Sequence, residues 1–123
     1  MILAVALLAC TDAPDTGVDT ASFDTTRTVE TSSFSISYAP DPDPIPFNEY
    51  FALAFEIDPV PTDFNFDARM PSHGHGMNVD PPESLDGETW RVENALFHMT
   101  GHWEIIVLVD GETAVFHTVV EVR

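Results

Sequence analysis

The chain has 123 residues, with four arginines, no lysine and 21 acidic residues, so its formal net charge at pH 7 is −17. Affinity for nucleic acid comes mainly from Lys and Arg that neutralise phosphates, so this composition argues against a nucleic-acid partner and, equally, against anionic lipid headgroups. The charge concentrates cations around the protein without defining a site for one, and an equally simple interpretation is that it only keeps the protein soluble.

Residues 1–9 form an apolar run that ends at Cys10. The run is too short to cross a bilayer as a helix and is typical of the core of a secretory signal segment. Leu7-Leu8-Ala9-Cys10 resembles the bacterial lipoprotein signal, in which the cysteine becomes the lipidated first residue of the mature protein. This resemblance implies lipidation at Cys10 and a place in the bacterial cell envelope, on its periplasmic or extracellular side. The alternative is a buried N-terminal strand with an incidental cysteine.

Cys10 is the only cysteine, so the chain can form no internal disulfide and no thiolate cage for a metal. Any metal must therefore be bound by His, Met or carboxylate groups. Residues 10–27 are acidic, rich in threonine and nearly devoid of large apolar side chains, which predicts a flexible linker. Residues 28–123 are sufficient for one compact domain.

Within residues 28–123 the dominant hydrophobic period is two, and no stretch shows a helical repeat. The proline-rich segment 39–46 is predicted to be a loop, and Asp110-Gly111 a hairpin turn. The segment 47–57 has apolar residues on both faces, which predicts an interior strand. Strands are expected over 29–38, 47–57, 64–70, 89–99, 103–109 and 113–122. The sequence therefore predicts an all-β protein, a β-sandwich of about six or seven strands.

Two short segments hold four of the five histidines and three of the four methionines: 70–77, Met-Pro-Ser-His-Gly-His-Gly-Met, and 97–103, Phe-His-Met-Thr-Gly-His-Trp. Thioether sulfur favours Cu(I), and imidazole nitrogen accepts Cu(II) as well. In an extended segment His73 and His75 project to the same side, with a methionine at each end of the segment. The second segment is predicted to be the tip of a hairpin.

The motifs Met-Pro-x-His-Gly-His-Gly-Met and Phe-x-Met-x-Gly-x-Trp, followed by alternating β residues, resemble the YtkA-like domain family over about residues 45–123. The resemblance implies an exported immunoglobulin-like β-sandwich associated with copper handling or cytochrome oxidase assembly. It also implies that the two segments lie side by side, so that Met99 completes a mixed His/Met site. The positions that match the family motifs are Met70, His73, His75, Met77, Met99 and Trp103, with Gly74, Gly76 and Gly101 as backbone positions.

The leading hypothesis is a lipid-anchored copper-binding protein that prefers Cu(I), accepts Cu(II), and exchanges copper with a donor or acceptor protein in the envelope. The membrane is contacted only through the lipid anchor. The candidate ligands are Met70, His73, His75, Met77 and Met99, and a second tier of metal or shell residues comprises His98, His102 and Trp103.

The competing interpretations are more ordinary. Methionines beside strands often serve as core filler, and His98, His102 and His117 are each more typical of surface or core histidines. The alternative function is a metal-free immunoglobulin-like interaction module that uses the His/Met/Gly loop for recognition. The sequence has no Ser-centred nucleophile motif and no phosphate-binding loop, so an enzyme is not expected.

Overall fold

The computed structural model describes residues 24–122, and every regular element in that range is a β-strand. The predicted signal segment, Cys10 and positions 10–23 of the predicted linker lie outside the described residues. Among the described residues no helix has the length and apolarity needed to span a membrane. The strands are β1 (Thr28–Glu30), β2 (Ser35–Asp41), β3 (Tyr50–Asp58), β4 (Phe64–Met70), β5 (His75–Gly76), β6 (Glu83–Asp86), β7 (Thr89–Leu96), β8 (Gly101–Val109) and β9 (Glu112–Val120).

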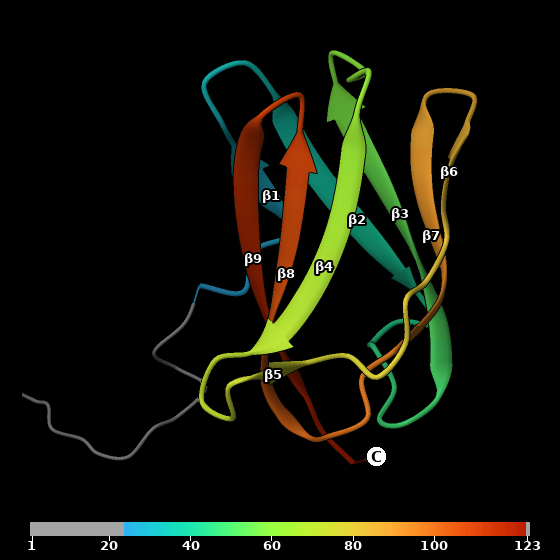
Figure 1. The fold of residues 1–123 in the computed structure, drawn as a ribbon, viewed down its shortest axis with the longest axis vertical. Helices are drawn as coiled ribbons and strands as arrows, with labels where there is room; N and C mark the ends of the chain where they lie inside the picture. Colours follow the sequence, from blue (N-terminus) through green and yellow to red (C-terminus); the bar gives the residue numbers. More distant parts are fainter. Residues whose placement is uncertain (1–23, 123) are drawn as a thin grey trace, which may run out of the picture.

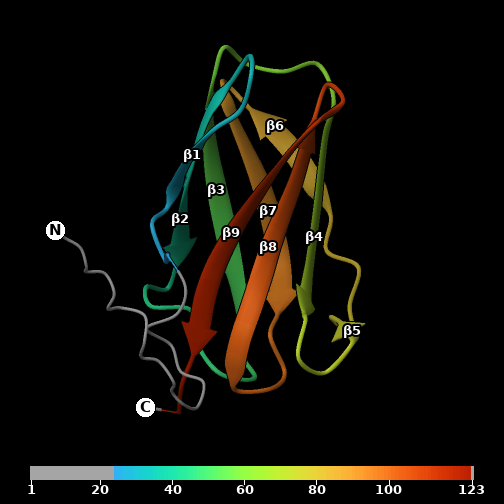
Figure 2. The same ribbon diagram turned by 90° about the vertical axis from the view of Figure 1, so that its left-hand side faces the viewer.

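The strands form two antiparallel sheets that pack face to face, which confirms the predicted all-β sandwich (Figures 1 and 2). One sheet has the order β1-β2-β3-β7-β6 and the other the order β5-β4-β8-β9. Without the short strands β1 and β5, seven strands remain. Of these seven, β2, β3, β7 and β6 form one sheet and β4, β8 and β9 form the other. An immunoglobulin-like domain divides its seven strands between two sheets in the same way.

The predicted strand 29–38 is in fact two strands, because a turn at 31–34 interrupts it. The amide of Thr31 donates to the carbonyl of Phe34 at 2.8 Å. The prediction that residues 39–46 contain no strand was also wrong at its start, since β2 continues to Asp41. Pro40 pairs with β3 on one side, and the pairing of β1 with β2 ends at Ser37. At Pro40 the side of β2 that faces away from β3 therefore has no partner strand, and a sheet tolerates a residue without an amide hydrogen at such an edge.

β3 is an interior strand, as predicted, but only one of its faces is core. Phe51, Leu53, Phe55 and Ile57 are buried, whereas Tyr50 on the other face is 62% exposed. Phe55 lies at the centre of an aromatic cluster drawn from both sheets, with ring centroids 6.0 Å from Tyr38, 5.2 Å from Phe64 and 6.4 Å from Phe116.

The prediction of a hairpin at 97–103 is wrong. β7 pairs with β3 and β6, whereas β8 pairs with β4 and β9, so the connection between β7 and β8 crosses from one sheet to the other. Buried aromatic rings hold this crossing. Phe97 stacks on Trp103 at 4.3 Å between ring centroids with an interplanar angle of 3°, and meets Phe51 of β3 edge-on at 4.9 Å.

Two carboxylates connect the sheets. Glu83 on β6 accepts a hydrogen bond from the amide of Phe66 on β4 at 2.7 Å. Glu112 on β9 accepts hydrogen bonds from the hydroxyl of Thr31 at 2.6 Å and the amide of Ser33 at 3.0 Å, both in the turn between β1 and β2. Burial raises the pKa of Glu83 above its usual value, whereas the hydrogen bonds lower the pKa of Glu112, the Thr31 hydroxyl contributing most.

We predict that Phe55→Ala lowers the free energy of unfolding by about 3–5 kcal/mol, because it removes the central ring of the aromatic cluster and leaves a cavity. Tyr50→Ala, an exposed aromatic on the same strand, should change it by no more than about 0.5 kcal/mol. Urea unfolding of both variants and the parent protein checks this. Equal losses in the two variants would contradict the assigned core.

The two carboxylates should respond to pH in opposite directions. The contribution of Glu112, whose folded pKa is lowered, is present above its unfolded pKa and lost as pH falls through the folded value. The contribution of Glu83, whose folded pKa is raised, is present below its unfolded pKa and lost as pH rises through the folded value. Relative to the parent, Glu112→Gln should therefore be least stable near pH 7, and Glu83→Gln should be least stable in acid. Urea unfolding at pH 7 and at about pH 3 gives the free energy of unfolding of each variant relative to the parent. If that relative stability changed in the same direction between the two pH values for both variants, the assignment would be refuted.

Candidate metal centre

A tight turn returns the chain from β4 to β5 at one end of the sandwich (Figure 1). The amides of His73 and Gly74 both donate to the carbonyl of Met70, at 3.1 and 2.9 Å. Gly74 has a φ of +71°, a conformation that costs glycine little. The turn places His75 directly opposite Met70 in the β4–β5 register, so the two side chains project to the same face of the sheet. His73 and His75 thus approach each other through a turn in which Gly74 takes a left-handed conformation.

The β7–β8 connection lies at the same end of the molecule as this turn in both ribbon views (Figures 1 and 2). Contact between the two segments is direct at Gly101. A Cβ added there would lie only 3.2 Å from the methyl carbon of Met70, and the φ of Gly101 is +121°. The bare glycine therefore lets the second His/Met segment pack against the first.

Three imidazoles form a row across this junction. The ring centroids of His73 and His75 are 5.7 Å apart, and those of His75 and His98 are 5.3 Å apart. Two imidazoles that share a tetrahedral metal, with metal–nitrogen bonds of about 2.0–2.1 Å, have ring centres roughly 5 Å apart. The spacing of each neighbouring pair is close to this value. Among the described residues the ligand atoms of all three rings do not lie within 4.8 Å of one another, so a common ion requires rotation of the side chains.

Trp103 lies beneath two of these rings. Its ring is fully buried and meets His75 at 6.5 Å and His98 at 5.8 Å, in both cases edge to face at 73°. The indole Nε1 donates to the carbonyl of Met99 at 2.9 Å, so its polar atom is satisfied. Trp103 thus acts as a rigid apolar base for the imidazole row.

The ring nitrogens of the row are arranged in a way that suits a ligand. Nδ1 of His75 lies 3.0 Å from the carbonyl oxygen of Gly76. A carbonyl only accepts, so Nδ1 carries the proton in this contact and the lone pair of a neutral ring is on Nε2. Nδ1 of His98 is buried and has no hydrogen-bond partner among the described residues. Buried polar atoms are rarely left unpaired, and a bound ion is one accepted reason for an exception.

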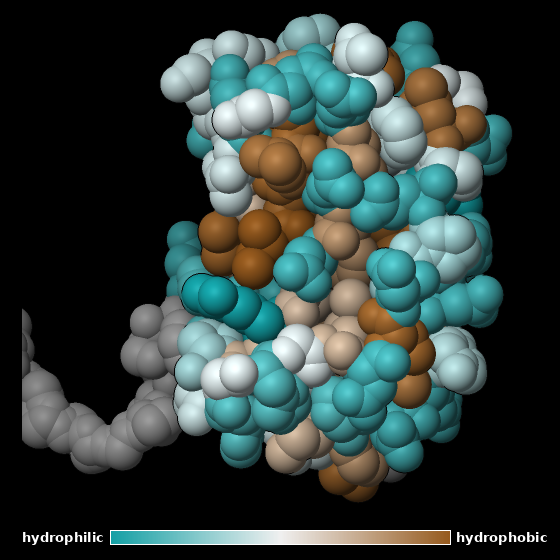
Figure 3. Space-filling model, viewed as in Figure 1, coloured by the Kyte–Doolittle hydropathy of each residue, from teal (hydrophilic) through white to brown (hydrophobic). Residues whose placement is uncertain are grey.

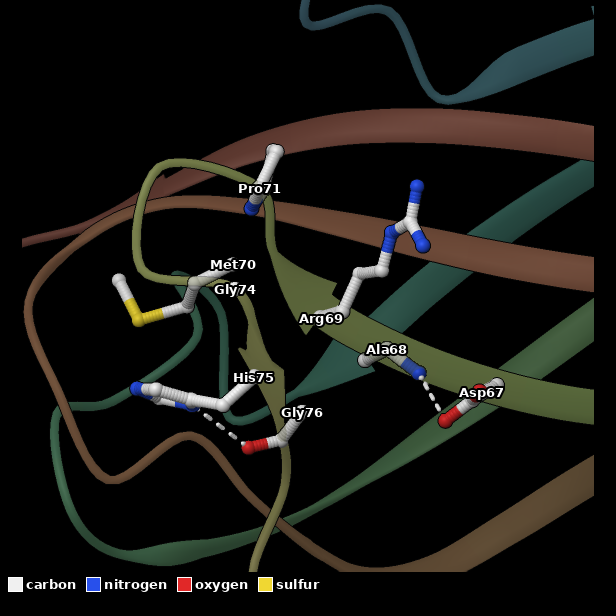
Figure 4. Close-up of a pocket in the computed structure, with 8 residues that line it drawn as sticks. All are labelled: Asp67, Ala68, Arg69, Met70, Pro71, Gly74, His75 and Gly76. Atoms are coloured by element: carbon white, nitrogen blue, oxygen red, sulfur yellow. Dashed lines mark hydrogen bonds between the residues drawn. The ribbon is translucent and has the colours of Figure 1, made fainter.

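The three candidate methionines are buried or half-buried. Met70 is fully buried, while Met77 and Met99 are half-buried and pack against the core. In the close-up of the surface hollow lined by Met70 and His75, the thioether and the imidazole extend in the same direction from their two strands (Figure 4). Met70 is thus placed near the row as predicted. The packing of Met77 and Met99 also fits the simpler role of core filler.

Two of the second-tier candidates behave differently from each other. His98 joins the imidazole row, although it occupies a variable position of the resembled family. His102 does not, because it lies on β8 and its Nε2 is 2.8 Å from Nδ1 of His117 on β9. His98 was not recognised as a primary ligand because its position depends on the chain crossing between sheets.

Comparisons with protein-family models, with curated proteins and with solved structures found no match. The resemblance to the YtkA-like family therefore stays a prediction.

We predict that His98→Leu makes the metal-free domain more stable by about 1–3 kcal/mol, because it removes an unpaired buried nitrogen while keeping an apolar side chain in place. His73→Leu, at an exposed position, should leave the metal-free stability nearly unchanged. Chemical unfolding in the presence of a strong chelator gives both values. A clear loss of stability in His98→Leu would show that Nδ1 has a partner.

Proposed function

We propose that this protein binds one copper ion at the imidazole row and passes copper to or from another protein of the cell envelope. The observation that carries the proposal is the proximity of the rings of His73, His75 and His98, which the β4–β5 turn, β5 and the β7–β8 connection supply, together with the unpaired buried nitrogen of His98. The family resemblance and the lipoprotein-like Cys10 support the same assignment.

The chemistry of the donor set favours copper over harder cations. Three imidazoles suit both Cu(I) and Cu(II), and the adjacent thioether of Met70 adds preference for Cu(I). Zinc would gain nothing from a sulfur of this kind. Met77 and Met99 are further candidate ligands of the same type, each half-buried beside the row.

The placement of the row suits exchange of the ion. His73 is exposed at the turn, whereas His75 and His98 are partly buried. A partner can therefore replace the outermost ligand first, while the inner imidazoles still hold the metal. Such a role requires no reaction at the protein, and it is compatible with accessory work in oxidase assembly, with Cys10 as the lipid anchor.

A competition titration with Cu(I), and separately with Cu(II), against a calibrated chelator tests the proposal. The full chain should carry Cys10→Ser so that no thiol competes for the metal. We expect a tight equivalent that His75→Ala and His98→Ala each weaken by more than about tenfold. His117→Ala removes an imidazole elsewhere on the same domain and serves as the matched control, which should retain the tight equivalent.

Weak copper binding that none of the variants changes would assign the metal to the acidic surface and remove the proposal. The metal-free interaction module would then be the better description of the His/Met/Gly loop. A tight equivalent that is lost in His117→Ala and kept in His75→Ala would place the copper at His102 and His117, on β8 and β9, and not at the imidazole row.

A further inference from the structure

A second group of metal-ligating side chains lies on the outer face of the four-stranded sheet, away from the imidazole row. It comprises His102 and Glu104 on β8 and His117 on β9. One ring nitrogen of each histidine and one carboxylate oxygen of the glutamate lie within 4.8 Å of one another. All three side chains are partly exposed.

The strand register explains the convergence. His102 and Glu104 are two residues apart on β8 and point to the same face, and Glu104 pairs directly with His117 across the strands. His102 is the diagonal neighbour of His117, and diagonal neighbours are within reach of long side chains. Regular β-structure, with no loop involved, therefore holds the three donors.

We infer that this cluster is a second metal site, which binds a divalent transition-metal ion of the Zn²⁺ class through two imidazoles and one carboxylate. Two histidines and one carboxylate are an established ligand set for zinc, and a fourth position remains for water. Ligand atoms around a tetrahedral zinc are roughly 3.3 Å apart, so small side-chain rotations suffice to form the site. The inference goes beyond the proposed copper function and does not depend on it.

The two histidines are already arranged around one shared proton. Nε2 of His102 and Nδ1 of His117 are 2.8 Å apart, a distance that requires one of the two nitrogens to donate and the other to accept. A metal ion that replaces this proton meets two nitrogens directed at each other. Burial, and then the neighbouring His117, lower the pKa of His102.

The surroundings of the cluster both help and limit binding. This face carries apolar side chains among hydrophilic ones (Figure 3), and Leu108 and Val115 are exposed there. Arg69 contacts Oε1 of Glu104 at 3.3 Å through its Nε, which orients the carboxylate but adds a positive charge. The side chain of Arg69 is 61% exposed, so it is free to turn toward solvent when a cation binds.

The site would connect the edge strand β9 to the interior strand β8. β9 is the last strand of its sheet and has β8 as its single partner in that sheet. A metal bound only in the folded state stabilises that state by an amount that grows with the logarithm of the ratio of free metal to its dissociation constant. Zn²⁺ should therefore raise the unfolding temperature of the protein.

The test uses the full chain with Cys10→Ser, His73→Ala and His75→Ala, so that neither the thiol nor the imidazole row competes for the metal. Titration with Zn²⁺ against a calibrated chromophoric chelator should show one saturable equivalent. His117→Ala and, separately, Glu104→Gln in this background should weaken it by more than the roughly 10- to 100-fold expected from loss of an outer-sphere partner. Glu56→Gln on β3 of the other sheet is the matched control and should change nothing.

Co²⁺ gives an independent readout, because a tetrahedral site produces intense visible absorption that carboxylates on the surface do not. That absorption should disappear in His117→Ala, while circular dichroism in chelator confirms that the variant is folded. Zn²⁺ binding that is weak, not saturable, or equal in all variants would overturn the inference. The Zn²⁺ titration reports on this cluster because His73 and His75 are absent, and the losses in His75→Ala and His98→Ala report on the imidazole row, so either proposal can fail while the other stands.

Discussion

The stack of Phe97 on Trp103 is the interaction on which the candidate metal centre depends. The two rings are fully buried and nearly parallel, with centroids 4.3 Å apart, and one follows β7 while the other belongs to β8. Edge contact with Phe51 ties the pair to the five-stranded sheet. Because these rings fix the path of the chain between sheets, His98 is held beside His75, and the loss of this stack would separate the imidazoles before it exposed most of the core.

Local patterns predicted most of the fold. The alternation from Phe64 to Met70 gave β4 with its observed bounds, and the burial pattern of β3 follows its sequence period. The short strands β5 and β6 were missed, since two and four residues carry too little periodicity to be recognised, and β1 was merged with β2 into one predicted strand. Pro40 was excluded from a strand because sequence alone does not show which edge of β2 stays unpaired.

The two histidine clusters differ in how far the sequence reveals them. Glu104 and His117 follow from counting: the Asp110-Gly111 turn places Val109 opposite Glu112, and five further residues along each strand bring the two side chains together. No such count places His98, because its neighbours depend on which sheet each successive strand joins. In an immunoglobulin-like strand order the strands that correspond to β7 and β8 belong to different sheets. The predicted fold class therefore already implied that the chain crosses between the sheets at His98.

The imidazole row is assembled from two segments that are distant in the sequence, the β4–β5 turn with β5 and the connection between β7 and β8. In an unfolded chain His73 and His75 remain near each other, but His98 is more than twenty residues away, and no three-ligand group exists. Under the proposed function, only the closed sandwich offers the three imidazoles together, so copper would reach the domain from a donor after folding.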